Sequence, residues 1–147
     1  MPTPGPTPQE MAATHAAAFT QARPWSAAEF ATLAADRFCH VAGDVRSFAL
    51  FRVIADETEL LTIATHPEHQ RSGLGRDRMD LWRLGAVALG ARRAFLDVAA
   101  DNAPALSLYA ACGFDRCGLR RGYYARPAGP PADAVLMTRD LPPSPHP

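Results

Sequence analysis

The apolar positions in the first half of the chain form three short runs that are separated by only a few polar residues. The runs cover 38–42, 47–54 and 60–65, and turn-forming residues follow the first two, at 43–44 and 55–57. Runs of this length, rich in β-branched and aromatic side chains, are typical of strands. Strands joined by such short turns pair with their neighbours in antiparallel orientation, so the pattern predicts a three-stranded meander.

Two helical stretches, 10–19 and 26–36, precede the meander. Ser26 is a good N-cap for the second stretch, because Glu29 follows three residues later and completes a capping box. Trp25 lies in the link between the two helices. A tryptophan in such a link either packs back onto the domain, which is the commoner role, or faces a ligand.

A longer helix is predicted at 73–89, because apolar residues recur there at helical spacing. We expect its apolar stripe to face the core, with the charged residues opposite. The stripe consists of Leu74, Leu81, Leu84 and Ala88, and the opposite face of Arg76, Asp80 and Arg83. The apolar segment 94–99 then reads as a strand that returns through this helix and therefore lies parallel to the third strand.

The last third of the chain predicts one more helix and two strands. Asn102 is the expected N-cap of the helix and Gly113 its C-terminal stop. We expect Leu108, Tyr109 and Cys112 on its inner side. The segments 114–119 and 134–141 supply the strands, and a separate stretch at 120–124 and a proline-rich loop lie between them.

Length and composition fit one folded domain, since the chain has 147 residues, of which 48% are hydrophobic. Its 14 prolines gather toward the two ends, so we expect disordered tails at 1–8 and 142–147 around a folded unit at 9–141. Fifteen basic and fifteen acidic residues cancel, which argues against bulk binding to nucleic acid or an anionic membrane.

Three further classes of protein are disfavoured. No stretch approaches the roughly 20 apolar residues of a membrane span, and no leader precedes the first helix, so we expect a cytoplasmic protein. Cys39, Cys112 and Cys117 are odd in number and lack C-x-x-C spacing, which indicates neither a disulfide framework nor a zinc site. We interpret the three cysteines as core or near-core thiols and expect no metal.

The segment 70–75, Gln-Arg-Ser-Gly-Leu-Gly, connects the third predicted strand to the long helix. The first N–H groups of a helix lack intrahelical partners and bind phosphate oxygens well. Other phosphate motifs fit poorly: a P-loop requires Gly-Lys-Ser or Gly-Lys-Thr, and only part of a dinucleotide fingerprint is present. Taken alone, the segment could also be a simple glycine-containing helix start; the flanking strand and helix favour an anion-binding loop.

The combined motifs resemble the GNAT superfamily of N-acetyltransferases. The resemblance rests on Q-x-x-G-x-G at 70–75 and L-D-V-A-A-D-N-A-P-A-L-S-L-Y-A-A-C-G-F at 96–114. E-L-L-T-I-A at 59–64 and R-R-G-Y-Y at 120–124 are similar to the bacterial enzymes that acetylate the N-terminal alanine of a ribosomal protein. The resemblance implies an α/β fold, with a mixed sheet whose parallel strands splay around the acetyl-CoA site. The family's usual first strand would fall where a proline-rich segment stands here.

Acetyl-CoA is the cosubstrate that this resemblance implies. The residues implied to hold its pyrophosphate are Arg71, Ser72, Gly73, Leu74, Gly75 and Arg76. The pantetheine arm is implied to lie along the strand end at Ile63, Ala64 and Thr65, as an added strand would. Asn102 is implied to contact the same arm, a role compatible with capping a helix.

Acetyl transfer to an amine requires one proton to leave the ammonium and another to reach the departing thiolate. Asp97 is the candidate base, because it is a carboxylate in an otherwise apolar strand, where burial would raise its pKa. The resembling enzymes carry glutamate there, one methylene longer. An Asp97 that is exposed where the sheet splays, or paired with an arginine, is an equally good interpretation. Tyr109 matches the family's tyrosine acid.

The resemblance implies that the acceptor is a protein N-terminus, and specifically the N-terminal alanine of ribosomal protein S18. Trp25, Tyr123, Tyr124 and Asp133 are the residues expected around such a peptide. Arg120 and Arg121 have three open roles, which are exposure to solvent, capping of strand ends and contact with ribosomal RNA. No direct nucleic-acid binding is predicted. We expect a monomer or weak dimer. Two alternatives stay open: acetylation of a small-molecule amine, and a non-catalytic acyl-CoA-binding module.

Overall fold

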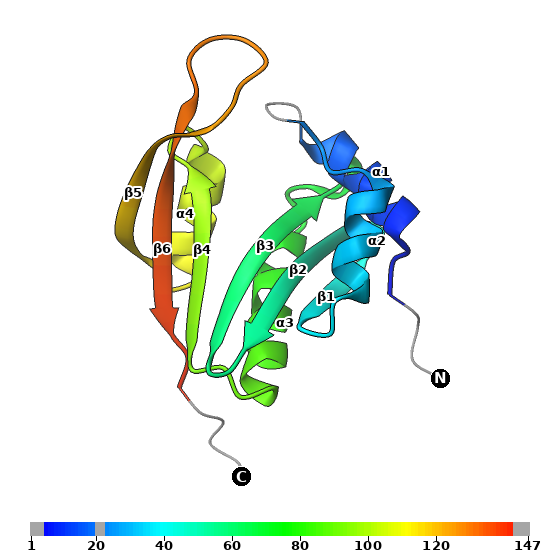
Figure 1. Cartoon of the computed structure of the whole chain (residues 1–147), viewed down its shortest axis with the longest axis vertical. Helices are drawn as coiled ribbons and strands as arrows, with labels where there is room; N and C mark the ends of the chain where they lie inside the picture. The colour runs from blue at the N-terminus through cyan, green and yellow to red at the C-terminus, as the bar shows by residue number, and fades with distance from the viewer. Residues whose placement is uncertain (1–4, 20–22, 143–147) are drawn as a thin grey trace.

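A computed structural model describes residues 5–19 and 23–142 as one mixed α/β domain (Figure 1). Its described part contains a six-stranded sheet in the order β1-β2-β3-β4-β6-β5. The elements in chain order are α1 (Pro8–Ala18), α2 (Ala27–Ala35), β1 (Cys39–Asp44), β2 (Ser47–Ile54), β3 (Glu57–Thr65), the 3₁₀ helix η1 (Pro67–His69), α3 (Leu74–Ala88), β4 (Arg93–Ala99), α4 (Ala103–Ala111), β5 (Asp115–Tyr124) and β6 (Ala132–Asp140). The predicted fold class is confirmed.

The two ends of the chain are only partly described. Residues 1–4 and 143–147, most of the two predicted tails, lie outside the described residues. Thr7 and Pro8 belong to the start of α1, where Thr7 and Glu10 form a capping box. No strand precedes α1 within the described residues. In the same part of the chain, no helix has both the length and the apolar character needed to cross a membrane.

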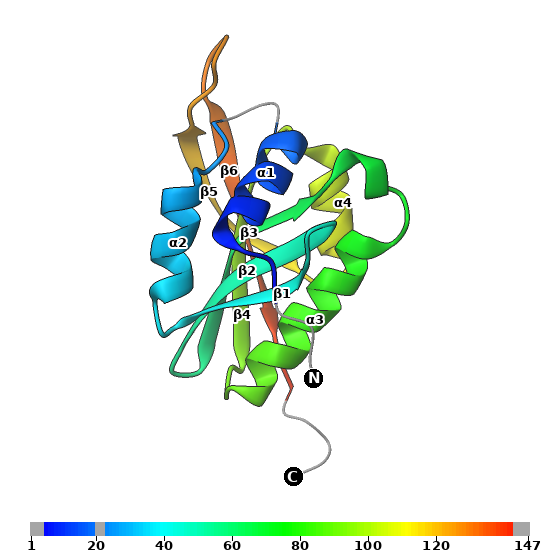
Figure 2. The same cartoon turned by 90° about the vertical axis from the view of Figure 1, so that its right-hand side faces the viewer.

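Helices cover both faces of the sheet around β2 (Figures 1 and 2). Ala49, Phe51 and Val53 on one face of β2 join a core cluster that includes residues of α3 and α4. Phe48 and Leu50 on the other face belong to a second cluster, which includes residues of α1 and α2. Because β2 is buried on both sides, nearly every one of its residues is apolar.

The core-facing side of α3 differs from the prediction. Leu81 and Leu84 are 39% and 56% exposed, and Ala88 is also exposed. The residues that face the core are Arg78, Met79, Trp82 and Ala86. This second stripe has the same helical spacing but larger side chains, and the Trp82 indole N–H donates to Thr58 Oγ1 at 2.9 Å. The sheet selects the stripe that contains tryptophan, since burying its large ring stabilises the fold more than burying a leucine.

The buried Arg78 attaches α3 to the β1–β2 hairpin. Its Nε donates to the Ser47 carbonyl at 2.8 Å, and its guanidinium lies 3.2 Å from the Asp44 carboxylate. Gly43 makes this approach possible, because its φ is +123° and an added Cβ would lie 2.3 Å from the Ser47 oxygen. The predicted turn at 43–44 is therefore wrong by two residues: β1 continues to Asp44, and the turn is at 45–46.

The predicted meander and the parallel strand are both confirmed. β1, β2 and β3 pair antiparallel in succession, and β4 pairs parallel to β3. The β3–β4 pairing covers only three residue pairs, from Glu57–Arg93 to Glu59–Phe95. β3 and β4 pair no further, so the sheet splays as the family resemblance implied (Figure 1).

The edge strand β5 is longer than predicted. It runs to Tyr124, so the stretch 120–124 continues the strand instead of forming a separate segment. Nine of its ten residues are exposed, including Cys117, which is therefore a surface thiol, whereas Cys39 and Cys112 are buried. β6 lies between β5 and β4, and it pairs antiparallel with both.

His15 connects α1 to the sheet and to the link before α2. Its ring is fully buried, and Nδ1 accepts from the Trp25 backbone N–H at 3.1 Å. The neutral ring therefore carries its proton on Nε2, which donates to Thr62 Oγ1 at 3.1 Å. Burial lowers the pKa of His15 from 6.5 to about 4, because desolvation disfavours the charged ring.

We expect His15 to make the stability of the domain depend on pH between 6.5 and 4. The folded-state pKa is depressed, so the contribution is complete above the unfolded value of 6.5 and decreases as the pH falls toward 4. The decrease is on the order of 3 kcal/mol. Urea unfolding at pH 7 and pH 4.5 should show a larger loss for the wild type than for His15→Gln. An equal loss in both proteins would contradict this role of His15.

Candidate functional site

The loop before α3 leaves the first amides of that helix without a side-chain cap. Gly73 is the N-cap residue, with φ +81°, and it provides no acceptor for the N–H groups that follow. The backbone of Arg71 also has a left-handed conformation, with φ +64°. Gly73 is required for its backbone conformation and not for space, since an added Cβ would meet nothing within 4 Å. Free amides at the start of a 15-residue helix are able to bind an anion, and this role of the loop stays a prediction.

The end of β3 beside this loop has an edge that β4 does not cover. Beyond Glu59, β3 pairs only with β2, and the last pair is Ser47–Thr65. Gln70 closes the end of this edge, because its Nε2 donates to the Thr65 carbonyl at 3.2 Å. The segment that contains Ile63 and Ala64 can therefore accept an extended ligand as an added strand.

Asp97 is exposed, which agrees with the second of its two interpretations and not with a buried carboxylate. The side chains of β4 alternate, so Ala94, Leu96 and Val98 are buried, whereas Asp97 projects to the opposite face. Its partner is a tyrosine and not an arginine: the Tyr124 hydroxyl donates to Asp97 Oδ1 at 2.8 Å. Asp97 thus lies at the splay of the sheet, in contact with solvent and with a neutral hydrogen-bond donor.

Tyr109 and Tyr124 are electrostatically coupled to this carboxylate. Burial raises the pKa of Tyr109, and the charge of Asp97 raises it further. The pKa of Tyr124 is also raised, first by burial and then by its hydrogen bond to Asp97. Both phenols therefore stay protonated near neutral pH, and the Tyr124 hydroxyl is the one that donates to this carboxylate.

Asn102 has a structural role that the sequence predicted. Its side chain accepts from the Ala105 backbone N–H at 3.2 Å and caps α4. α4 places Tyr109 on its inner side, because Tyr109 follows Asn102 by about two turns. The cap therefore helps to position Tyr109, and a contact between Asn102 and a ligand stays a prediction.

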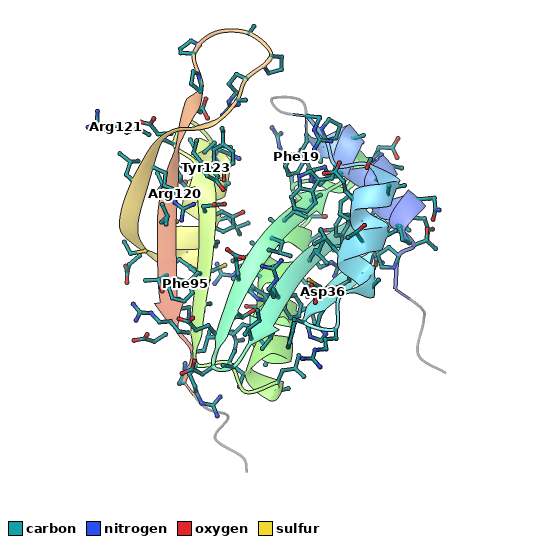
Figure 3. All side chains as sticks on the ribbon, viewed as in Figure 1. Phe19, Asp36, Phe95, Arg120, Arg121 and Tyr123 are labelled. Carbon is teal, nitrogen blue, oxygen red and sulfur yellow. The ribbon has the colours of Figure 1, made fainter. Side chains whose placement is uncertain are left out.

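The residues predicted around an acceptor are divided between the two halves of the sheet. Trp25 packs against the buried rings of His15 and Phe30, with centroids 5.3 and 5.6 Å away. Tyr123 is 51% exposed and stacks edge-on against Tyr124, with centroids 5.2 Å apart. In Figure 3, Tyr123 lies on the side of β5 that faces α1, with Phe19 across the splay.

Sequence reasoning missed the ion pair between Asp101 and Arg126. Arg126 lies in the proline-rich loop after β5, and its guanidinium donates to Asp101 Oδ1 at 2.7 Å. The two residues are 25 positions apart, and no local pattern links them. Asp133, which was predicted beside a peptide, accepts from the Gly122 backbone N–H at 2.8 Å and so has a role inside the β5–β6 hairpin.

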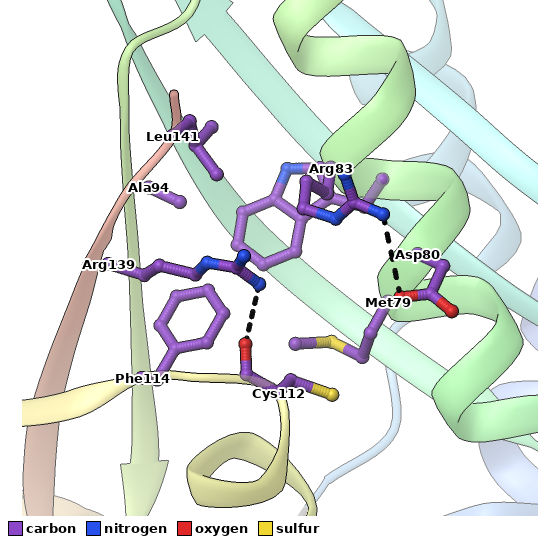
Figure 4. Close-up of a pocket in the computed structure, with 9 residues that line it drawn as sticks. Met79, Asp80, Arg83, Ala94, Cys112, Phe114, Arg139 and Leu141 are labelled. Atoms are coloured by element: carbon purple, nitrogen blue, oxygen red, sulfur yellow. Dashed lines mark hydrogen bonds and ion pairs between the residues drawn. The ribbon is translucent and has the colours of Figure 1, made fainter. Parts of the chain in front are cut away.

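The pocket drawn in Figure 4 is separate from this site. It is lined by Met79, Asp80, Trp82, Arg83, Ala94, Cys112, Phe114, Arg139 and Leu141. Ala94 and Asp97 lie on opposite faces of β4, so the pocket and the carboxylate are on different sides of the sheet. Arg139 donates to the Cys112 carbonyl at 2.6 Å and thereby caps the C-terminal end of α4.

Comparison with known proteins gives a consistent family assignment. Residues 8–114 match the model of the Acetyltransferase (GNAT) family. The [Ribosomal protein bS18]-alanine N-acetyltransferase of Escherichia coli K12 is 35% identical over 130 residues, which cover 86% of this chain and 87% of that protein.

Two solved structures are similar to the structure of this chain. The crystal structure of the ribosomal-protein-S18-alanine N-acetyltransferase from Escherichia coli has a TM-score of 0.83 and 28% identity, covering 95% of this chain and 90% of that one. Nourseothricin acetyltransferase has a TM-score of 0.61 and 31% identity, covering 68% of this chain and 60% of that one.

We expect Asp97→Asn to lower the pKa of Tyr124. The substitution removes the charge and the carboxylate acceptor that raise this pKa, although burial of the phenol remains. Spectrophotometric titration of tyrosinate should therefore show ionisation at lower pH in Asp97→Asn than in the wild type. The difference should be much smaller when both proteins also carry Tyr124→Phe. Identical titrations of wild type and Asp97→Asn would contradict the coupling.

Proposed function

This chain belongs to the acetyltransferase (GNAT) family, and we propose that it acetylates the N-terminal amine of a protein, most specifically the N-terminal alanine of ribosomal protein bS18. The observation that carries the proposal is the hydrogen bond from the Tyr124 hydroxyl to Asp97 beside the splay between β3 and β4, with Tyr109 near enough for the charge of Asp97 to raise its pKa. The relative that is 35% identical over most of both chains supports the choice of acceptor.

The donor side of the site suits acetyl-CoA. The uncapped amides at 71–76 would hold its pyrophosphate, and Arg71 and Arg76 add positive charge. The free edge of β3 at Ile63, Ala64 and Thr65 would hold its pantetheine arm. Bound there, the cosubstrate supplies a thioester whose carbonyl carbon the amine attacks.

Asp97 and Tyr109 divide the proton transfers. An α-ammonium group has a pKa of about 8, so a base must remove its proton before attack. The aspartate side chain is one methylene shorter than the family's glutamate. Because Asp97 is exposed to solvent, a water molecule between Asp97 and the amine would carry this proton to the carboxylate. Tyr109 stays protonated, because burial raises its pKa, and it donates toward the departing sulfur. The reaction then proceeds by direct attack in a ternary complex.

The acceptor would enter from the side of the sheet opposite the loop before α3. Tyr123 has the exposed surface to stack on a peptide, while Tyr124 lies behind it against Asp97. Trp25 supports the opposite wall through its packing on His15 and Phe30. The similarity to nourseothricin acetyltransferase favours one second candidate, a small-molecule amine as acceptor.

We expect Tyr109→Phe to reduce kcat at least 100-fold with a peptide that begins with alanine, because loss of a positioned proton donor typically costs this much. The affinity for acetyl-CoA should stay within twofold of wild type. Steady-state kinetics of coenzyme A release and calorimetric binding measure the two quantities. Full activity of Tyr109→Phe would exclude the acid role.

The same assay with small amines separates the two acceptor classes. Turnover of an amino acid, polyamine or aminoglycoside with no turnover of peptides would favour the small-molecule acceptor. Mass spectrometry of protein N-termini in cells with and without the protein identifies the natural acceptor. Acetyl-CoA binding without turnover of any amine would instead indicate a non-catalytic module.

We expect Gly73→Ala to weaken acetyl-CoA binding about tenfold, because the left-handed backbone that presents the α3 amides becomes strained. Gly90→Ala is a matched control at the other end of α3, since Gly90 also has a positive φ, +99°, and nothing near its absent Cβ. Each substitution should lower the unfolding free energy by about 1 kcal/mol. Only Gly73→Ala should change the calorimetric Kd. Equal changes in Kd would contradict the anion-binding role of the loop.

A further inference from the structure

Three polar contacts join the β5–β6 hairpin to the carboxyl end of β4, in addition to the antiparallel pairing of β6 with β4. The Tyr124 hydroxyl donates to Asp97 at 2.8 Å, and the Arg126 guanidinium donates to Asp101 at 2.7 Å. The backbone N–H of Ala100 donates to the Asp133 carbonyl, also at 2.8 Å. All three contacts fall within residues 97–101, so one short segment at the end of β4 and just beyond it contacts the end of the hairpin.

A bulge in β5 directs the strand toward these contacts. Arg120 pairs with Ala134 and Tyr124 with Ala132, so three residues of β5 lie opposite one residue of β6. Gly122, in the middle of the bulge, has φ +61°, and its N–H is bound by the Asp133 carboxylate at 2.8 Å. Bulges bend a strand and re-aim the side chains that follow. Here the following side chain is Tyr124, which reaches past β6 to Asp97.

The ion pair of Asp101 and Arg126 is a second contact between the hairpin and the segment after β4. Arg126 lies in the hairpin loop, two residues beyond Tyr124. The Arg126 side chain is only 10% exposed, whereas that of Asp101 is 65% exposed. A largely buried guanidinium depends on its carboxylate more than a surface arginine does. Asp101 also precedes the N-cap of α4, where a helix dipole favours negative charge. The pair therefore joins the loop after β5 to the rigid start of α4.

The two carboxylates at this end of β4 have partners of different charge. Asp101 is paired with a cationic guanidinium, while Asp97 accepts from a phenol. An incoming ammonium group therefore meets a neutral hydroxyl at Asp97, whereas it meets the Arg126 guanidinium at Asp101. Because Arg126 occupies Asp101 and a phenol binds Asp97, Asp97 is the carboxylate that the acceptor amine would approach.

We propose that the Asp101–Arg126 ion pair is a positioning pair for the acceptor side of the site, which holds the β5–β6 hairpin on β4 so that Tyr124 stays bound to Asp97. Its effect on turnover rests on the proposed acetyltransferase function, whereas its effect on the Tyr124–Asp97 contact does not. The donor loop belongs to the other half of the splayed sheet, so donor binding is independent of the pair.

Steady-state kinetics with an alanine peptide tests this pair. Arg126→Met should raise the acceptor KM and lower kcat/KM about tenfold, with the KM for acetyl-CoA within twofold of wild type. Arg126→Lys keeps the charge and should recover activity to within threefold. Arg93→Ala is the matched control, because Arg93 forms an exposed ion pair with Asp140 at the far end of β4. Arg126→Met and Arg93→Ala with the same kinetics would overturn the proposal.

A double-mutant cycle shows whether Asp101 and Arg126 act through one another. Asp101→Asn should reproduce the loss seen in Arg126→Met, and the double variant should lose no more than either single variant. Losses that multiply in the double variant would overturn the pairing. Asp101→Asn also keeps the test valid if Arg126→Met is poorly folded.

Spectrophotometric titration of tyrosinate needs no substrate and separates the two proposals. In Arg126→Met the pKa of Tyr124 should fall, as it should in Asp97→Asn, because the phenol leaves its carboxylate partner. This fall in a protein that acetylates no amine would support the positioning pair and overturn the proposed function. An unchanged titration alongside normal wild-type turnover would overturn the pair alone.

Discussion

The parallel pairing of β3 and β4 stops after three residue pairs, and the rest of the structure depends on this early separation. β3 stays rigid because β2 pairs with its whole length, and β4 stays rigid because β6 does the same on its other side. The two halves of the sheet can therefore diverge without loss of order. The divergence leaves strand edge on β3 and one carboxylate on β4, the two surfaces that a thioester donor and an amine acceptor require.

Each half of the sheet has its own means of holding the site. On the β3 side, Arg78 attaches α3 to the β1–β2 hairpin, which fixes the helix whose first amides face the splay. His15 attaches α1 to Thr62 of the same strand from the opposite face. On the β4 side, the Asn102 cap positions α4 and Tyr109, and the β5–β6 hairpin positions Tyr124. The proposed donor and acceptor surfaces are thus built from different parts of the chain.

Buried polar side chains recur at these attachments, and Trp82, Thr58 and His15 are each hydrogen-bonded. The Trp82 indole is bound by Thr58, whose hydroxyl donates to the Arg52 carbonyl. The His15 ring uses both nitrogens. Buried polar groups cost stability when they lack partners, so each bonded pair disfavours other arrangements of the same helices.

The sequence by itself determined the local elements, the family and the glycine-containing loop before α3, because their signals lie within a few residues of one another. The Ser26–Glu29 capping box, the Asn102 cap and the glycine at the start of α3 are contacts of this kind. The tertiary structure decided what depends on packing between distant segments. It selected the Trp82 face of α3 over the leucine face, since both have helical spacing and only the sheet distinguishes them.

Tertiary structure also decided the surroundings of Asp97. Alternation along β4 predicts that Asp97 opposes its apolar neighbours, but its exposure depends on which helices cover that face. Its partner Tyr124 is 27 residues away, and Arg126 is 25 residues from Asp101. Such contacts arise because β6 inserts between β4 and β5, an arrangement that no local pattern encodes.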